Sequence, residues 1–147
     1  MQIAAPDTPS SRPLVLLLED DVDTREMYHM ALEFDGCHVV DSLTATEVVS
    51  RAGEMLPDVI VTDIVLRGDA DGIAVAEHLK ANPRTAAIPV LAVTGVDPLS
   101  LRARPGLFER VLLKPVLPDF LSAEIRRLLK RQVERGPADG KLLRPND

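Results

Sequence analysis

Four apolar segments of the sequence end in a residue that could take part in phosphate or metal chemistry. Glu19 and Asp20 follow the first apolar run, Asp63 follows the third, Thr94 ends the fourth, and Lys114 follows the fifth. If these segments are parallel strands of one sheet, their carboxyl ends lie along one edge, and residues distant in the sequence meet in one cleft.

The chemistry that this set supports is phosphoryl transfer. Three carboxylates close together repel one another at neutral pH. A hard divalent cation such as Mg2+ relieves that repulsion, because it prefers carboxylate, water and phosphate oxygens. Asp63 could then act as a nucleophile that forms an aspartyl-phosphate, with Lys114 and the Thr94 hydroxyl contacting the phosphoryl oxygens.

Each of these residues also has an ordinary structural interpretation. An acid after a strand is commonly a solvated loop residue or a helix N-cap, and a threonine or lysine there is unexceptional. The joint pattern, with a suitable residue at each of four strand ends, favours the functional interpretation.

The elements that would position these residues alternate between strands and helices. We predict strands at 14–18, 37–41, 58–62, 89–93 and 110–113, several of them continuous apolar runs typical of strands buried on both faces. We predict helices at 23–34, 44–54 with Thr44 as N-cap, 73–81, 99–104 and 118–133. The first helix is expected to face the core with Met27, Met30, Ala31 and Phe34, and the last with Leu121, Ile125, Leu128 and Leu129.

This order predicts an α/β fold with a doubly wound, five-stranded parallel sheet and helices on both faces. The alternation alone allows either common strand order. The chain of 147 residues suits one domain over 13–133, flanked by a flexible N-terminal arm at 1–12 and a flexible C-terminal tail at 134–147.

The composition argues against other classes of protein. The net charge of -6 disfavours direct nucleic-acid binding, so we interpret the basic residues of the last helix as a solvated face or as partners in dimer salt bridges: Arg126, Arg127, Lys130, Arg131 and Arg135. No apolar run is long enough to span a membrane, and no signal peptide is recognised. Cys37, the only cysteine, is expected to be a buried structural thiol.

The sequence resembles the receiver domains of two-component response regulators over residues 13 to about 131. The segments that carry the resemblance occur in the family's order and spacing: Leu16–Glu26, Pro57–Asp63, Asp71–Gly72, Ile88–Gly95 and Leu113–Pro115. The resemblance implies the flavodoxin-like strand order 2-1-3-4-5.

The resemblance also implies a role for each site residue. Asp63 would be the phosphoacceptor, Asp20 a direct Mg2+ ligand, Glu19 a ligand through water, and the backbone carbonyl of Val65 a further ligand. Thr94 would be the switch hydroxyl, Lys114 the active-site lysine, and the bond before Pro115 would be cis.

Three features depart from the family's pattern. Val111 stands where the family usually has an aromatic residue three positions before the lysine, and Phe108 is a distant substitute. The segment between Thr94 and Lys114 is short and contains Pro105. Arg67 replaces a common proline in the loop after Asp63, which also has an extra residue. These changes predict an altered output surface beside intact phosphorylation chemistry.

The resulting hypothesis is a stand-alone response regulator that is phosphorylated on Asp63 and switches a protein-binding face. The family implies a histidine kinase or histidine phosphotransfer protein as donor, a downstream target protein and a bacterial cytoplasm; a homodimer stays open. One alternative is an interaction module that does not use phosphorylation. Another is an aspartate-nucleophile phosphatase, which would need an acid where Val65 stands, and Asp69 and Asp71 read as turn residues instead.

Overall fold

The five predicted strands form one parallel sheet. The computed structural model describes residues 12–66, 71–95 and 106–143, with side chains described up to residue 134. The strands are β1 (Leu14–Leu18), β2 (His38–Ser42), β3 (Val59–Asp63), β4 (Val90–Thr94) and β5 (Arg110–Leu113). Their order is β2-β1-β3-β4-β5, which confirms the flavodoxin-like topology, and each predicted strand lies within one residue of the observed one.

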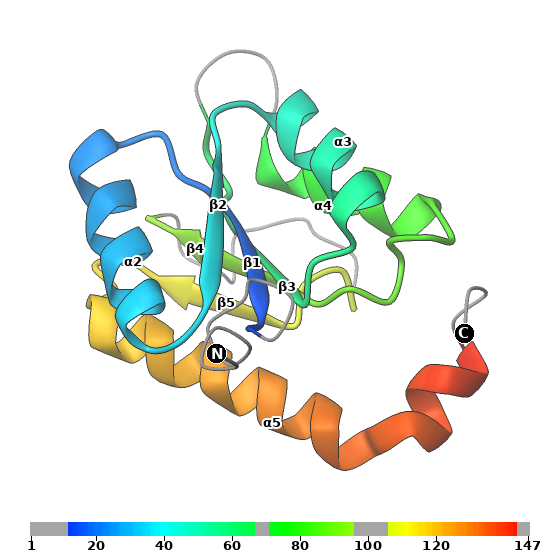
Figure 1. Ribbon diagram of the computed structural model, residues 1–147. Coiled ribbons are helices and arrows are strands. Elements are labelled where there is room, and N and C mark those ends of the chain that lie inside the picture. Colours follow the sequence, from blue (N-terminus) through cyan, green and yellow to red (C-terminus); the bar gives the residue numbers. More distant parts are fainter. Residues whose placement is uncertain (1–11, 67–70, 96–105, 144–147) are drawn as a thin grey trace, which may run out of the picture.

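Helices cover both faces of this sheet (Figure 1). They are α2 (Val22–Phe34), α3 (Ala45–Met55), α4 (Gly72–Ala81) and α5 (Pro118–Leu143). Helices α2 and α5 pack on one face, where residues such as Leu17 and Val61 point, and α3 and α4 pack on the other, where Leu16 and Ile60 point. The continuous apolar strands are explained by this two-sided burial.

Three of the helices begin at side-chain caps. Asp21, Thr44 and Asp71 precede α2, α3 and α4, and each accepts a hydrogen bond from a backbone N–H in the first turn of its helix. The prediction of Thr44 as an N-cap is thereby confirmed. Asp71 therefore has a structural role as a helix cap, in line with its interpretation as a turn residue.

The predicted core face of α2 was wrong. Tyr28 and Leu32 are the buried residues of this helix, whereas Met30 and Phe34 are 70% and 95% exposed. Apolar residues lie on two sides of α2, and the side with Tyr28 also places Arg25 and His29 where they can bond neighbouring elements. Those polar contacts and the burial of the large Tyr28 ring favour the observed rotation.

His29 joins α2 to the edge strand β2. Its Nδ1 lies 3.0 Å from Asp41 and its Nε2 lies 3.1 Å from Glu33. Burial acts to lower the pKa of His29, but the hydrogen bonds and charges of Asp41 and Glu33 outweigh it, so the net shift of the pKa is upward.

This raised pKa predicts a pH-dependent contribution to stability. A histidine whose pKa is raised in the folded state contributes its full stabilisation of the fold below the ordinary histidine pKa. This contribution is lost as the pH rises through the folded-state pKa. We expect His29→Gln to lower the free energy of unfolding more at pH 5.5 than at pH 8.5, measured by urea denaturation. An equal loss at both pH values would contradict this role.

The C-terminal end of the last helix differs from the expectation. Helix α5 runs to Leu143, beyond the predicted end at Val133, so it extends into the segment that was predicted as a tail. Pro137 lies within this helix. A proline inside a helix can be accommodated by a kink, and Figure 1 shows α5 changing direction in its last part. The predicted arm at 1–11, the predicted helix at 99–104 and the loop residues 67–70 lie outside the described residues.

Two further expectations concern single features. Cys37 is buried, and burial together with the nearby acids raises the pKa of its thiol, which confirms a structural role. Within the described part of the chain, no helix is long and apolar enough to cross a membrane.

Candidate functional site

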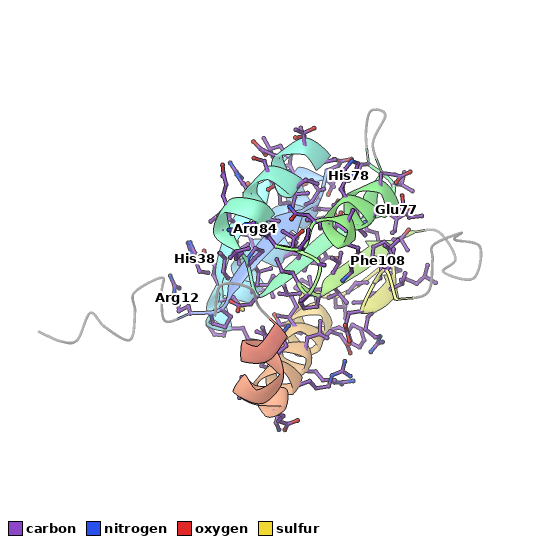
Figure 2. The ribbon with its side chains drawn as sticks, turned by 90° about the vertical axis from the view of Figure 1, so that its right-hand side faces the viewer. Arg12, His38, Glu77, His78, Arg84 and Phe108 are labelled. Atoms are coloured by element: carbon purple, nitrogen blue, oxygen red, sulfur yellow. The ribbon has the colours of Figure 1, made fainter. Side chains whose placement is uncertain are left out.

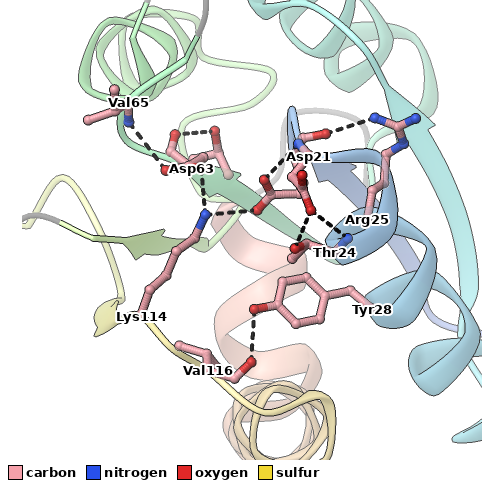
Figure 3. Close-up of polar contacts among 10 residues, drawn as sticks. Asp21, Thr24, Arg25, Tyr28, Asp63, Val65, Lys114 and Val116 are labelled. Carbon is pink, nitrogen blue, oxygen red and sulfur yellow. Dashed lines mark hydrogen bonds and ion pairs between the residues drawn. The ribbon is translucent and has the colours of Figure 1, made fainter.

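The ends of β1, β3 and β5 bring two buried acids and a lysine together. Glu19 and Asp63 are 3% and 7% exposed. The Lys114 Nζ donates to Asp63 Oδ2 at 2.8 Å and lies 3.2 Å from Glu19 Oε1 (Figure 3). The predicted convergence of Glu19, Asp63 and Lys114 at one sheet edge is therefore observed.

Lys114 is held as a cation by this arrangement. Partial burial acts to lower the pKa of its ammonium, but the hydrogen bond that the ammonium donates to Asp63 and the charges of Asp63 and Glu19 outweigh it, so the pKa is raised. A donor that is charged at neutral pH therefore lies against the carboxylate that was predicted to accept a phosphoryl group.

The turn after β1 is held by hydrogen bonds between side chains and the backbone. The Glu19 side chain accepts a hydrogen bond from the backbone N–H of Asp21 at 3.0 Å, and the Glu19 carbonyl accepts one from Arg25 at 2.9 Å. Asp20 lies within this turn and is partly buried. Sequence reasoning missed Arg25, although the residue was part of the segment that carried the family resemblance.

The backbone around Asp63 is equally constrained. Its Oδ1 accepts a hydrogen bond from the backbone N–H of Val65 at 3.3 Å, and its carbonyl accepts one from the Thr62 hydroxyl at 2.9 Å. Gly72, the first residue of α4, donates its N–H to the Ile64 carbonyl at 2.7 Å. This close approach of α4 fixes the direction in which the Asp63 side chain leaves the sheet.

Thr94 lies on the neighbouring strand. It is the last residue of β4, is fully buried, and its backbone carbonyl accepts the N–H of Lys114 at 2.7 Å. The register pairs Asp63 with Val93, so Thr94 is one position further along the strand beside it. This places Thr94 at the same edge as Asp63 and Lys114.

The donor chemistry of the site fits Mg2+, although the predicted ligands do not form a metal-binding group as they stand. Among the residues that the structure describes, no three Asp, Glu, His or Cys side chains are grouped so that they could hold an ion. Lys114 lies between Glu19 and Asp63 instead. Two buried carboxylates facing one ammonium, with Asp20 beside them, leave excess negative charge, and oxygen donors of this kind suit a hard cation.

Val111 occupies the position of the family's usual aromatic residue, and Phe108 was considered as its substitute. Val111 is partly buried on β5 and supplies no ring, and Phe108 packs against the core under α3 and α4 (Figure 2). Phe108 therefore serves that core, and the departure at Val111 stands.

The basic residues of α5 mostly have partners within the chain. Arg126 pairs with Asp35, Arg131 with Glu109 at 2.7 Å, and Arg127 lies 3.7 Å from Glu124. The arginines of these pairs are exposed, and ion pairs with an exposed partner add little to stability. They do satisfy these cations internally, in line with the interpretation of a solvated helix face.

A doubly wound sheet with an acidic site at its carboxyl edge defines a flavodoxin-like domain. The family model described as "Response regulator receiver domain" matches residues 15–126. The chain therefore belongs to the response regulator receiver domain family.

Individual proteins are similar to most of the chain. It is 31% identical over 119 residues to the phosphate regulon transcriptional regulatory protein PhoB of Escherichia coli K12, a match that covers 80% of this chain and 52% of PhoB. It is 28% identical over 128 residues to an uncharacterized 14.6 kDa protein of Leptolyngbya boryana, covering 85% of this chain and 93% of that protein.

A solved structure of a receiver domain protein is also similar to this chain. The CheY-like response regulator receiver domain protein of Methanospirillum hungatei matches with a TM-score of 0.73 and 26% identity, covering 86% of this chain and all of the other. The chain spans about half the length of the curated transcriptional regulators that it matches.

Proposed function

We propose that this domain accepts a phosphoryl group on Asp63 and acts as a switch in a two-component pathway. The observation that carries the proposal is the buried Asp63 carboxylate with the Lys114 ammonium 2.8 Å from one oxygen, at the carboxyl edge of a receiver sheet. A carboxylate needs no base to make it a nucleophile, because it is already deprotonated at neutral pH.

The transfer replaces the bond between phosphorus and the donor with a bond between phosphorus and Asp63. An Asp63 oxygen forms a bond to phosphorus while the bond from phosphorus to the donor's imidazole nitrogen, or to the acetate oxygen of acetyl phosphate, breaks. The leaving group takes the electron pair, and a departing imidazole takes a proton from solvent. Asp63 becomes a mixed anhydride that water can later hydrolyse.

The other residues of the site would position the phosphoryl group and neutralise its negative charge. Lys114 would pair with one phosphoryl oxygen, and the Thr94 hydroxyl would donate to another. Glu19, Asp20, Asp63 and the Val65 carbonyl would hold Mg2+, which when bound neutralises part of the charge on the phosphoryl oxygens.

The proposal extends to partners by family. Receiver domains are signalling phosphoacceptors rather than turnover enzymes, so the donor would be a histidine kinase or histidine phosphotransfer protein and the recipient of the signal a target protein. A cytoplasmic location fits such partners. A stand-alone regulator is one form of the proposal, and the relative from Leptolyngbya boryana is matched over nearly its whole length, whereas PhoB is not.

Intact-mass analysis after incubation with acetyl phosphate tests the proposal. We expect one phosphoryl adduct on the wild-type protein with Mg2+, and none with EDTA or on Asp63→Asn, because that amide cannot act as the nucleophile. Asp41→Asn, on the edge strand β2, is the matched control and should be labelled like wild type. An adduct that survives on Asp63→Asn would place the chemistry elsewhere.

A second candidate is a phosphorylation-independent interaction module. The observation that favours it is Val111, which supplies no aromatic ring beside the site on β5. The same experiment separates the two candidates, because folded wild-type protein that forms no adduct with Mg2+ present would support the module.

A further inference from the structure

Tyr28 joins α2 to the segment that carries the site lysine. The ring is 2% exposed and belongs to the core under α2 and α5, and Val116 packs against the same core. The Tyr28 hydroxyl donates to the backbone carbonyl of Val116 at 2.9 Å, a contact between residues 88 positions apart (Figure 3).

Val116 lies two residues after Lys114, so this hydrogen bond fixes one side of the lysine. The N–H of Lys114 is already bonded to the Thr94 carbonyl at 2.7 Å on the other side. Between the two anchors stands Pro115, whose ring restricts its own φ. The backbone from which the Lys114 side chain departs is therefore held at both ends.

The Tyr28 hydroxyl also lies within the electrostatic reach of the site. Burial raises the pKa of Tyr28 most, the negative charges of Glu19 and Asp63 raise it further, and Lys114 opposes them. The phenol therefore stays protonated at neutral pH and remains able to donate its hydrogen bond.

We propose that Tyr28 is a positioning residue of the phosphoacceptor site, whose hydroxyl fixes the Lys114–Val116 segment so that the Lys114 ammonium lies against Asp63. The consequence for phosphorylation rests on the proposed function. The consequence for the position of the Lys114 ammonium does not rest on the proposed function, and it can be measured on its own.

Tyr28→Phe is the variant that isolates the hydroxyl, because the ring that fills the core remains. Thr85→Val is the matched control. The Thr85 hydroxyl is also buried and donates to a backbone carbonyl, that of Leu79, at 2.6 Å, but it lies in the connection from α4 into the start of β4, at the opposite edge of the sheet. The two variants should therefore lose comparable stability.

The primary measurement is NMR of protein labelled with carbon-13 at the lysine side chains. The chain has Lys80, Lys114, Lys130 and Lys141, so the Lys114 signal can be assigned from a Lys114→Met sample. In Tyr28→Phe we expect the Lys114 signal to move, as the ammonium loses part of its contact with Asp63 and Glu19. Thr85→Val should leave the Lys114 signal as in wild type.

The second measurement is the rate of adduct formation with acetyl phosphate and Mg2+. We expect Tyr28→Phe to lower the maximal rate about two- to tenfold, the range for one lost hydrogen bond, with no such loss in Thr85→Val. An unchanged Lys114 signal in folded Tyr28→Phe would overturn the inference, whatever the rate. Wild-type protein that forms no adduct would instead overturn the proposed function, while the NMR result would still decide the role of Tyr28.

Discussion

Replacing Gly72 with alanine is expected to lower the free energy of unfolding by about 2 kcal/mol or more, a large loss for the addition of one methyl group. A Cβ at this position would lie 2.1 Å from the Asp63 carbonyl oxygen and 2.9 Å from the Ile64 Cα. Both atoms belong to the backbone, so no flexible side chain can give way. Either the start of α4 or the end of β3 must move.

The displacement should also reach the site. The Gly72 N–H bonds the Ile64 carbonyl, directly after the predicted phosphoacceptor, so a shift of α4 breaks this bond or carries the Asp63 backbone with it. We therefore expect slower adduct formation with acetyl phosphate even at temperatures where Gly72→Ala is folded.

Gly53→Ala is the matched control for this substitution. Gly53 lies within α3, and a Cβ there would meet nothing within 4 Å. Because alanine favours helix more than glycine does, this variant should gain up to about 1 kcal/mol. Urea denaturation of both variants measures the difference, and equal effects of the two substitutions would refute the steric argument at Gly72.

Gly72 also illustrates what could be predicted from the sequence. Asp71-Gly72 belonged to the family pattern, but the reason for a glycine appears only when α4 is placed against the end of β3. Three of the strands could be predicted from their composition, because β1, β3 and β4 are largely apolar runs that are buried on both faces, whereas the edge strands β2 and β5 are only partly buried. The site followed from them, since parallel strands bring their carboxyl ends to one edge.

The sequence could not predict contacts that depend on packing between distant elements. Helix α2 has apolar residues on two sides, so its periodicity allowed two rotations, and the choice of Met30 and Phe34 as core residues was wrong. The bond from Tyr28 to Val116 has no local signal either, because it depends on that rotation and on the position of the segment before α5. The strand order itself came from the family resemblance rather than from periodicity.

The predicted metal ligands lie where the sequence placed them, but their contacts could not be predicted. Sequence and structure both place Glu19 and Asp63 at one edge, yet the structure has Lys114 between them. Lysine and a divalent cation would neutralise the same carboxylates, so occupancy of the site by one changes what the other contributes. After the phosphoacceptor Asp63 itself, Lys114 is therefore the residue with the largest expected effect on the chemistry.

Lys114→Met is expected to lower the rate of adduct formation by about 100-fold, the usual loss when one donor to developing negative charge is removed. Lys114 lies 2.8 Å from Asp63, within reach of a phosphoryl group on that residue, and methionine keeps most of the side-chain volume without the charge. The initial rate with acetyl phosphate and Mg2+ measures the effect. Lys130→Met, on the exposed face of α5, is the control and should react like wild type.

The same substitution should destabilise the fold, because Glu19 and Asp63 stay buried without their cation. Loss of the charged hydrogen bond from Lys114 to Asp63 is expected to cost about 2 kcal/mol at pH 7. The raised pKa of Lys114 means that its contribution is fully present below 10.5, its ordinary pKa, and is lost as the pH rises through the higher folded-state pKa. On the alkaline side, the difference between wild type and Lys114→Met should therefore be constant near neutrality and shrink in strong alkali.

Mg2+ should restore part of that lost stability if the proposed metal site is correct. A cation bound by Glu19, Asp20 and Asp63 would replace the charge that Lys114 supplied, and binding to the folded state alone raises the free energy of unfolding. We therefore expect Mg2+ to raise the melting temperature of Lys114→Met more than that of wild type or Lys130→Met, at matched ionic strength. If Mg2+ stabilises all three proteins equally, these carboxylates do not hold the ion, and the metal assignment fails while the role of Lys114 in the rate remains to be judged from its own measurement.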